Sequence, residues 1–154
     1  MNFKKILTAL VMMSALSTYS IAGNALSEGM VKEAKKGVKG ITPQALKKKF
    51  DNDDEVYMLD IREPYMIVEG SIDSDESVEI PRGLLEFNTP AKIKNKNSFI
   101  VVYCRSGKAA PLAAQTLIKD LHYKNVVYLI GGINGWLNAG YSIYNAFGEM
   151  SLTK

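Results

Sequence analysis

A chain of 154 residues has room for one domain with its own hydrophobic core and little else. Apolar residues make up 47% of the chain and charged residues 23%, a composition typical of globular proteins that excludes low-complexity, collagen-like and disordered chains. With one cysteine the chain cannot form an internal disulfide, and one cysteine with one histidine cannot form a structural zinc site.

Residues 1–22 have the three parts of a secretory signal peptide. Lys4 and Lys5 form a basic start, residues 6–16 form an apolar run, and small residues precede a cleavage site after Ala22 or, alternatively, after Ala25. The apolar run is shorter than the roughly 20 residues of a membrane span, although an anchor that is never removed is the alternative. The sequence therefore predicts a periplasmic or secreted protein that is free of the membrane after cleavage.

Cleavage also changes what the net charge indicates. The formal charge of the whole chain is +3, and loss of Lys4 and Lys5 lowers it to +1. So small a positive charge gives little support to nucleic-acid or membrane binding, and we expect neither of the mature protein.

Predicted helices alternate with predicted strands along the rest of the chain. Residues 26–36 are rich in Ala, Lys and Glu and predict a leading helix, within an N-terminal extension over residues 23–40. Thr42 and Pro43 are a typical helix start, with Thr42 as the N-cap. The elements that follow are strands at 56–61, 77–80, 98–103 and 125–130, a helix at 108–121, and a helix that contains Trp136 and ends at Gly140.

Strands that read as continuous apolar runs between helices are typical of an α/β domain with a mainly parallel sheet. In such a sheet, sites form beyond the carboxyl ends of the strands. Three segments would meet there: residues 60–62, residues 104–108 and residues 131–132. The single cysteine, Cys104, would thus end a buried strand and precede a helix.

The sequence around Cys104 favours a reactive thiolate. The next residues lead into a helix N-terminus, where unpaired amides and the helix dipole stabilise an anion. Arg105 and Lys108 add two positive charges, and Gly107 lets the backbone curl so that several amides point to one centre. The alternative is a structural thiol packed in the core, because free cysteines are often buried.

No general base accompanies Cys104 at a telling spacing. The only histidine, His122, lies in the turn after the helix at 108–121 and is interpreted as a surface residue. The loop itself would therefore have to activate the thiol, which suits reactions whose leaving group is already a stable anion.

Four segments, in this order, make the chain resemble the single-domain rhodaneses. They are Leu59-Asp60-Ile61-Arg62-Glu63, Ile80-Pro81-Arg82-Gly83-Leu84-Leu85-Glu86-Phe87, Val101-Val102-Tyr103-Cys104-Arg105-Ser106-Gly107, and Leu129-Ile130-Gly131-Gly132-Ile133-Asn134-Gly135-Trp136. The resemblance covers about residues 41–143 and assigns residues 41–154 to a rhodanese-like domain. It implies a five-stranded parallel sheet flanked by helices on both faces.

From the resemblance we expect a sulfurtransferase. Cys104 would take a sulfane sulfur from thiosulfate or polysulfide and pass it, as a persulfide, to a thiophilic acceptor such as cyanide or a thiol. The implied site consists of Cys104 as nucleophile, Arg105, Ser106, Gly107, Lys108 and Ala109 around the persulfide, Arg62 and Arg82 at the rim, and Asp60 as structural support. An ion pair with Asp60 is the alternative role of Arg62.

The expected partners are small sulfur-containing anions and a sulfur-accepting protein. The covalent persulfide requires no cofactor and no metal. The protein would be a monomer or a homodimer, with the leading helix available for dimer contacts. Both the donor and the acceptor stay open, because Ala109 stands where many relatives carry Arg and the stretch from Gly70 to Pro81 is longer and more acidic than usual.

Three other functions are alternatives to enzymatic sulfur transfer. A phosphatase of a related fold would need an arginine where this chain has Ala110, so this activity is not expected. A carrier that delivers persulfide sulfur to a partner protein without free turnover stays open. An inactive interaction module stays open as well.

Overall fold

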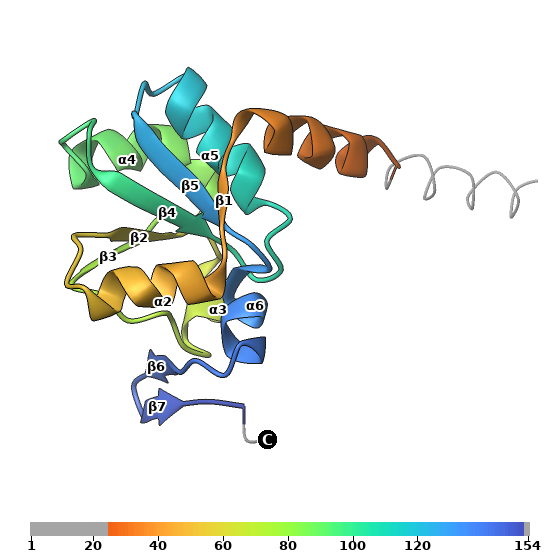
Figure 1. Ribbon diagram of the computed structural model, residues 1–154. Helices are drawn as coiled ribbons and strands as arrows, with labels where there is room; N and C mark the ends of the chain where they lie inside the picture. The colour runs from red at the N-terminus through yellow and green to blue at the C-terminus, as the bar shows by residue number, and fades with distance from the viewer. Residues whose placement is uncertain (1–24, 153–154) are drawn as a thin grey trace, which may run out of the picture.

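The computed structural model describes residues 25–152, so the signal peptide predicted for residues 1–22 lies outside the described part of the chain. Residues 25–37 form a helix, as predicted for 26–36, and this N-terminal helix projects away from the sheet (Figure 1). The further elements are β1 (Gly40–Ile41), α2 (Pro43–Asp51), β2 (Tyr57–Asp60), α3 (Pro64–Ile67), β3 (Glu76–Glu79), the 3-10 helix η1 (Arg82–Leu84), α4 (Leu85–Lys92), β4 (Phe99–Tyr103), α5 (Ala110–Lys119), β5 (Asn125–Leu129), α6 (Gly132–Asn138), β6 (Ile143–Asn145) and β7 (Gly148–Met150).

A five-stranded parallel sheet forms the centre of the domain, in the order β1-β5-β4-β2-β3. β4 is the middle strand, and its Val101 is in register with Val127 of β5 and Met58 of β2. Because a middle strand in a covered sheet has no polar face, the uninterrupted apolar sequence of β4 follows from its position. The predicted parallel sheet is confirmed.

Helices cover both faces of this sheet. In Figure 1, α4 and α5 lie on one face, and α2 and α6 lie on the other. Successive residues of β4 alternate between the two cores: Ile100 and Val102 pack with α5, whereas Val101 and Tyr103 pack with α2 and α6. Cys104, the residue after β4, continues this alternation on the α5 face.

The start of α2 is the one predicted from Thr42 and Pro43. The Thr42 side chain accepts a hydrogen bond of 3.2 Å from the amide of Ala45, and Pro43 occupies the first turn. This cap satisfies one amide that would otherwise have no partner in the helix. It fixes the point at which the chain leaves β1 and turns beneath the sheet.

A short hairpin, β6–β7, follows α6 near the end of the described residues. Tyr144 exchanges two backbone hydrogen bonds with Ser71, of 2.8 and 2.9 Å, and Ile143 is buried in the core with Trp136. The Trp136 side chain also donates to the carbonyl of Ser142 at 2.7 Å. These contacts join the end of the chain to the segment that follows α3.

Between residues 25 and 152, every helix falls short of the length and apolar character needed to cross a membrane.

Candidate active site at Cys104

Cys104 lies at the carboxyl end of the middle strand. It follows Tyr103 of β4, and five residues separate it from Ala110, where α5 begins. Pro111 occupies the first turn of α5, where a missing amide hydrogen costs nothing. The predicted order of strand, cysteine, loop and helix is therefore confirmed.

The loop after Cys104 is held against the first turn of α6. The amide of Ile133 donates to the carbonyl of Cys104 at 2.9 Å, and the amide of Asn134 donates to the carbonyl of Arg105 at 3.1 Å. Two glycines make this approach possible. A Cβ on Gly132, whose φ is +60°, would lie 2.2 Å from the Cys104 oxygen, and one on Gly107, whose φ is +73°, would lie 2.8 Å from the Gly131 nitrogen.

The loop keeps its own amides available. Among the residues that the structure describes, no acceptor receives a hydrogen bond from the backbone N–H groups of residues 105–109. Four of these five residues are exposed, so water can satisfy their amides in the free protein, and an anion bound inside the loop would take the place of that water. The loop lies directly before the first turn of α5, whose dipole also favours negative charge.

Cys104 itself is 7% exposed and borders the apolar core on the α5 face. Cys104 is therefore a buried residue at the boundary between the core and the loop.

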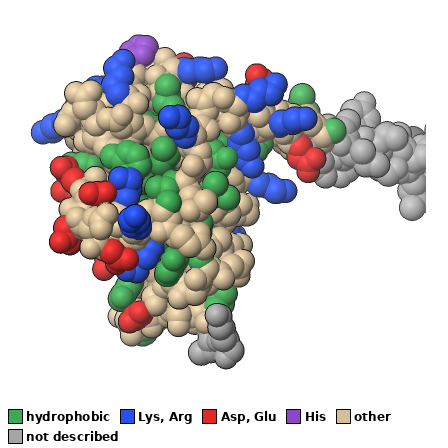
Figure 2. Space-filling model, in the orientation of Figure 1, with side chains coloured by type: hydrophobic (Ala, Val, Ile, Leu, Met, Phe, Trp, Pro, Cys, Tyr) green, Lys and Arg blue, Asp and Glu red, His purple; other side chains and the backbone are tan. Residues whose placement is uncertain are grey.

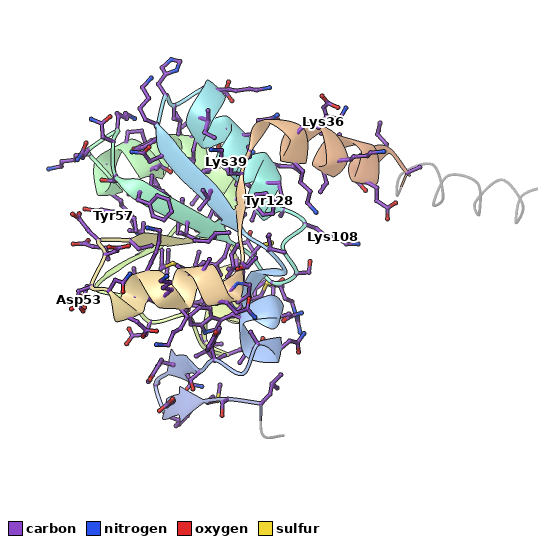
Figure 3. The ribbon with its side chains drawn as sticks, in the orientation of Figure 1. Lys36, Lys39, Asp53, Tyr57, Lys108 and Tyr128 are labelled. Carbon is purple, nitrogen blue, oxygen red and sulfur yellow. The ribbon has the colours of Figure 1, made fainter. Side chains whose placement is uncertain are left out.

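The predicted positive charges of the loop lie on its outer side. Arg105 and Lys108 are both exposed, and within residues 25–152 neither forms an ion pair. Figure 3 shows Lys108 extending from the loop before α5, on the side toward which the N-terminal helix projects. Of the other loop residues, Ser106 and Ala109 are exposed and Gly107 is buried.

Arg62 and Asp60 form a buried ion pair behind β2. The Arg62 Nη2 atom lies 2.6 Å from Oδ2 of Asp60, and their side chains are 3% and 2% exposed. Nη1 donates to the carbonyl of Met66, and Nη2 also donates to the carbonyl of Gly70 and to the Ser71 hydroxyl. Burial lowers the pKa of Arg62, but the hydrogen bonds and charge of Asp60 outweigh burial and raise it overall. Every nitrogen of the Arg62 side chain is therefore engaged within the protein.

Arg82 occupies a more open position at the start of η1. Its Nη1 donates to Glu86 at 2.9 Å and its Nη2 donates to the Thr116 hydroxyl of α5 at 3.2 Å. The side chain is 38% exposed. It links η1 to the helix that follows the Cys104 loop.

His122 lies far from the thiol. It is exposed, has a φ of +60°, and follows the C-terminal end of α5, whereas Cys104 precedes the N-terminal end. A ten-residue helix is about 15 Å long, which separates the two residues. The interpretation of His122 as a surface turn residue is confirmed.

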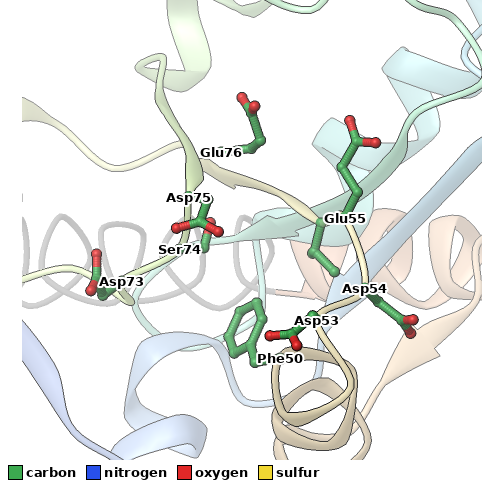
Figure 4. Close-up of a pocket in the computed structure, with 9 residues that line it drawn as sticks. Phe50, Asp53, Asp54, Glu55, Asp73, Ser74, Asp75 and Glu76 are labelled. Atoms are coloured by element: carbon green, nitrogen blue, oxygen red, sulfur yellow. The ribbon is translucent and has the colours of Figure 1, made fainter.

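A different pocket lies at the opposite edge of the sheet. Figure 4 shows acidic side chains around it, from the turn before β2 and the segment that leads into β3: Asp53, Asp54, Glu55, Asp73, Asp75 and Glu76. In a parallel sheet the amino ends of β2 and β3 lie away from the carboxyl end of β4, so this pocket is remote from Cys104. Within the described residues, no group of His, Cys, Asp and Glu side chains is arranged to hold a metal ion.

Sequence reasoning found the place of the loop but missed how it is held. Gly131 and Gly132 were expected near Cys104, but the two amides that anchor the loop belong to Ile133 and Asn134. Backbone donors carry no side-chain signature, so only the Gly131-Gly132 pair could have indicated them. The contribution of Thr116 to the position of Arg82 was also not predicted.

The fold and the cysteine loop define a known class of protein. The family model for the rhodanese-like domain matches residues 42–139, which is well over half of the chain. The chain therefore belongs to the rhodanese-like domain family.

Three similar proteins show the range of this relationship. A protein of Allochromatium vinosum named "Sulfurtransferase" is 29% identical over 106 residues, which cover 69% of this chain and 94% of that protein. The Bacillus subtilis protein named "Putative sulfur carrier protein YrkF" is 32% identical over 96 residues, 62% of this chain, and this chain spans about half (49%) of its length. The solved structure of RPA3614 from Rhodopseudomonas palustris, titled a possible tyrosine phosphatase, is 28% identical with a TM-score of 0.67 and covers 76% of this chain and 92% of its own.

Proposed function

We propose that this protein is a rhodanese-type sulfurtransferase that carries a sulfane sulfur on Cys104. The observation that carries the proposal is the position of its only cysteine, directly before five consecutive backbone amides that have no acceptor within the described residues. A terminal persulfide sulfur is an anion that such amides can stabilise. The likeness to a sulfurtransferase supports the same chemistry.

The proposed reaction has two displacements at sulfur. The Cys104 thiolate attacks the outer sulfur of thiosulfate, the S–S bond of the donor breaks, and sulfite leaves with the electron pair. Cyanide or a thiolate then attacks the outer sulfur of the persulfide, and the Cys104 thiolate leaves in turn. Neither step needs a cofactor, a metal or a general base, because both leaving groups are stable anions.

The charged residues would act on the donor rather than on the sulfur itself. Arg105 and Lys108 are exposed and unpaired within residues 25–152, so they are available to attract a small anion to the loop. Arg62 would serve by fixing Asp60 and the segment around Gly70, because its donors are already occupied. Arg82 would hold α5 through Thr116.

The phosphatase title of one similar structure does not transfer to this chain. Enzymes that hydrolyse phosphate esters with a cysteine loop clamp the phosphate with an arginine, and the corresponding position here is Ala110. Ala110 is the first residue of α5 and is fully buried in the core. The loop therefore has no side chain to bind a phosphate in a bidentate manner at this position.

The experiment is intact-mass spectrometry followed by a steady-state assay. Treatment with thiosulfate or polysulfide should add about 32 Da, the mass of one sulfur, to the protein, and cyanide should remove it as thiocyanate. Cys104→Ser should lose both the adduct and the thiocyanate. A wild-type protein that forms no adduct with any donor would contradict the proposal and favour an inactive interaction module.

A sulfur carrier is the second candidate, favoured by the likeness to YrkF and by the low exposure of Cys104. A carrier would form the same adduct but would turn over slowly with cyanide and with small thiols. The same two measurements therefore distinguish it from an enzyme. We also propose an exported location, which N-terminal sequencing of the mature protein tests by the loss of residues 1–22.

A further inference from the structure

The N-terminal helix forms a groove with the beginning of α5. This helix, residues 25–37, lies outside the segment that the family model matches. The groove has a volume of about 580 Å³ and is lined by Ser27, Glu28, Met30, Val31, Lys32, Lys35, Lys108, Ala109 and Leu112. One wall of the groove is therefore the N-terminal helix, which lies outside the matched domain, and the other is the beginning of α5, which lies inside it.

The lining of the groove combines apolar side chains with positively charged ones. Met30, Val31, Ala109 and Leu112 supply apolar surface, and Met30 is 55% exposed. The charged residues of the lining are three lysines and one glutamate. Lys35 lies over the ring of Tyr128 at 5.9 Å from the centroid, and in the described part of the chain neither Lys32 nor Lys108 has a carboxylate within ion-pair distance.

The groove is continuous with the Cys104 loop. Lys108 and Ala109 belong both to the loop and to the lining of the groove. Figure 2 shows lysines along the N-terminal helix, on the side of the molecule away from the acidic residues at the amino ends of β2 and β3. A molecule bound in the groove would therefore lie beside the loop that follows Cys104.

We propose that this groove binds the tail of an anionic, partly apolar small thiol that exchanges sulfur with Cys104. Its methylene groups would lie on Met30 and Leu112, and its carboxylate would lie near Lys32 and Lys35. The volume is that of a small-molecule site, which ranges over about 300–1,000 Å³. A thiol at the end of a slender chain also suits a cysteine that is only 7% exposed.

This inference rests on the proposed persulfide chemistry and names its acceptor. The thiolate of the bound molecule attacks the outer sulfur of the Cys104 persulfide, the S–S bond breaks, and the electron pair leaves on the Cys104 sulfur. The acceptor departs as its own persulfide. Electrons and atoms balance without an oxidant or a reductant.

The test is a single-turnover series with the persulfide form of the full mature protein. The acceptors are mercaptopropionate, mercaptohexanoate and mercaptooctanoate, with mercaptohexanol and mercaptooctanol as neutral partners of matched length. We expect the rate constant to rise at least about tenfold from the shortest to the longest carboxylate, since a fully buried methylene is worth about fourfold and the longest acceptor has about five more of them, of which two would suffice. Each alcohol should react several-fold more slowly than its carboxylate.

A charge-reversal pair locates the effect in the groove. Lys32→Glu with Lys35→Glu should reduce the ratio of the mercaptooctanoate rate to the mercaptooctanol rate by about tenfold, as expected for two lost attractions. Lys36→Glu with Lys39→Glu is the matched control, because both residues lie in or next to the same helix but outside the groove. It should leave that ratio unchanged.

Two failures are separable in this design. If Cys104 takes up sulfur normally but the single-turnover rate constant does not depend on the length or charge of the acceptor, the groove proposal is wrong and the proposed function stands. An equal response to both pairs of lysine variants would also overturn it. No adduct on Cys104 would overturn the sulfurtransferase itself, and the groove proposal with it.

Discussion

Gly132 is the residue on which the shape of the Cys104 loop depends. Its φ of +60° is one that residues with a side chain seldom adopt, and a Cβ there would lie 2.2 Å from the carbonyl oxygen of Cys104 and 2.8 Å from that of Arg105. Because both neighbours are backbone atoms, they cannot move aside as a side chain could. The loop after Cys104 would have to move away from α6.

Gly132→Ala should therefore impair sulfur transfer. A displacement of about 1 Å at a reacting group can cost about 100-fold in rate, and we expect a loss of this order in the rate of persulfide formation. Gly83→Ala is the control, since no atom lies within 4 Å of the added Cβ. Equal rates for the two variants would show that contact with α6 does not set the geometry of the loop.

Arg62 and Arg82 were both expected at the rim of the site, yet they lie in different surroundings. Removing the Arg62 guanidinium leaves the buried Asp60 carboxylate without its charge partner, and Arg62→Ala should cost about 3–5 kcal/mol in the free energy of unfolding. Arg82→Ala breaks a partly exposed pair with Glu86 and should cost no more than about 1 kcal/mol.

Urea unfolding of the two variants measures this difference, and steady-state kinetics with thiosulfate separate structure from binding. A structural Arg62 predicts lost stability, whereas Arg82→Ala serves as the reference for an exposed arginine. An Arg62→Ala protein that keeps its stability but shows a raised KM for thiosulfate would instead make Arg62 a substrate-binding residue.

At the scale of elements, the sequence predicted what hydrophobic pattern and capping determine. β4 and β5 were evident as apolar runs because both faces of the sheet are covered, and α2 was evident from Thr42 and Pro43. The N-terminal helix was evident from its composition. In each case the information is local, and tertiary contacts agree with it.

Other elements depend on contacts that the local sequence does not encode. β1 is two residues long and exists because Gly40 and Ile41 pair with Tyr128 and Leu129. α4 contains Pro90, which argues against a helix, yet Leu85 and Thr89 are buried along it. The hairpin β6–β7 has three residues in each strand and is fixed by Ser71, which lies more than 70 residues earlier in the chain.

In the candidate site too, some features follow from the local sequence and others depend on tertiary contacts. Cys104, its loop and the glycine pair at 131–132 could be placed together from the rule that sites form at the carboxyl ends of parallel strands. The full engagement of Arg62 could not, because it depends on the carbonyls of Met66 and Gly70, and backbone acceptors leave no trace in sequence. The groove beside the loop likewise depends on where the N-terminal helix docks.

Across the whole molecule, charge is distributed between the two edges of the sheet. The acidic residues around the pocket lie where β2 and β3 begin, whereas Arg105, Lys108 and the lysines of the N-terminal helix lie on the side of the Cys104 loop (Figures 2 and 3). Lysines also lie among the acidic side chains, as in the Lys49–Asp54 ion pair, so the negative charge there is partly balanced. Arg105 and Lys108 beside the loop would favour the approach of anions to the sulfur site.

The stability of the whole domain should decrease in alkaline solution because of buried tyrosines. Burial, followed by the charge of Asp60, raises the pKa of Tyr103, and burial raises the pKa of Tyr123 as well. In the unfolded chain both phenols ionise near pH 10, while in the folded chain they stay neutral beyond that point. Their contribution is thus fully present below about pH 9 and decreases as the pH rises above about 10, because only the unfolded state then releases protons.

Urea unfolding between neutral pH and about pH 11 measures this effect through the slope of stability against pH, which approaches about 1.4 kcal/mol per pH unit for each such group. Tyr103→Phe should make the alkaline slope shallower, since it removes one of the two buried phenols whose pKa is raised. Tyr65→Phe, at an exposed position, is the control and should leave the slope as it is. An alkaline slope that is the same in Tyr103→Phe as in the unaltered protein would mean that the Tyr103 phenol ionises as readily in the folded domain as in the unfolded chain, against its burial in the core that β4 forms with α2 and α6.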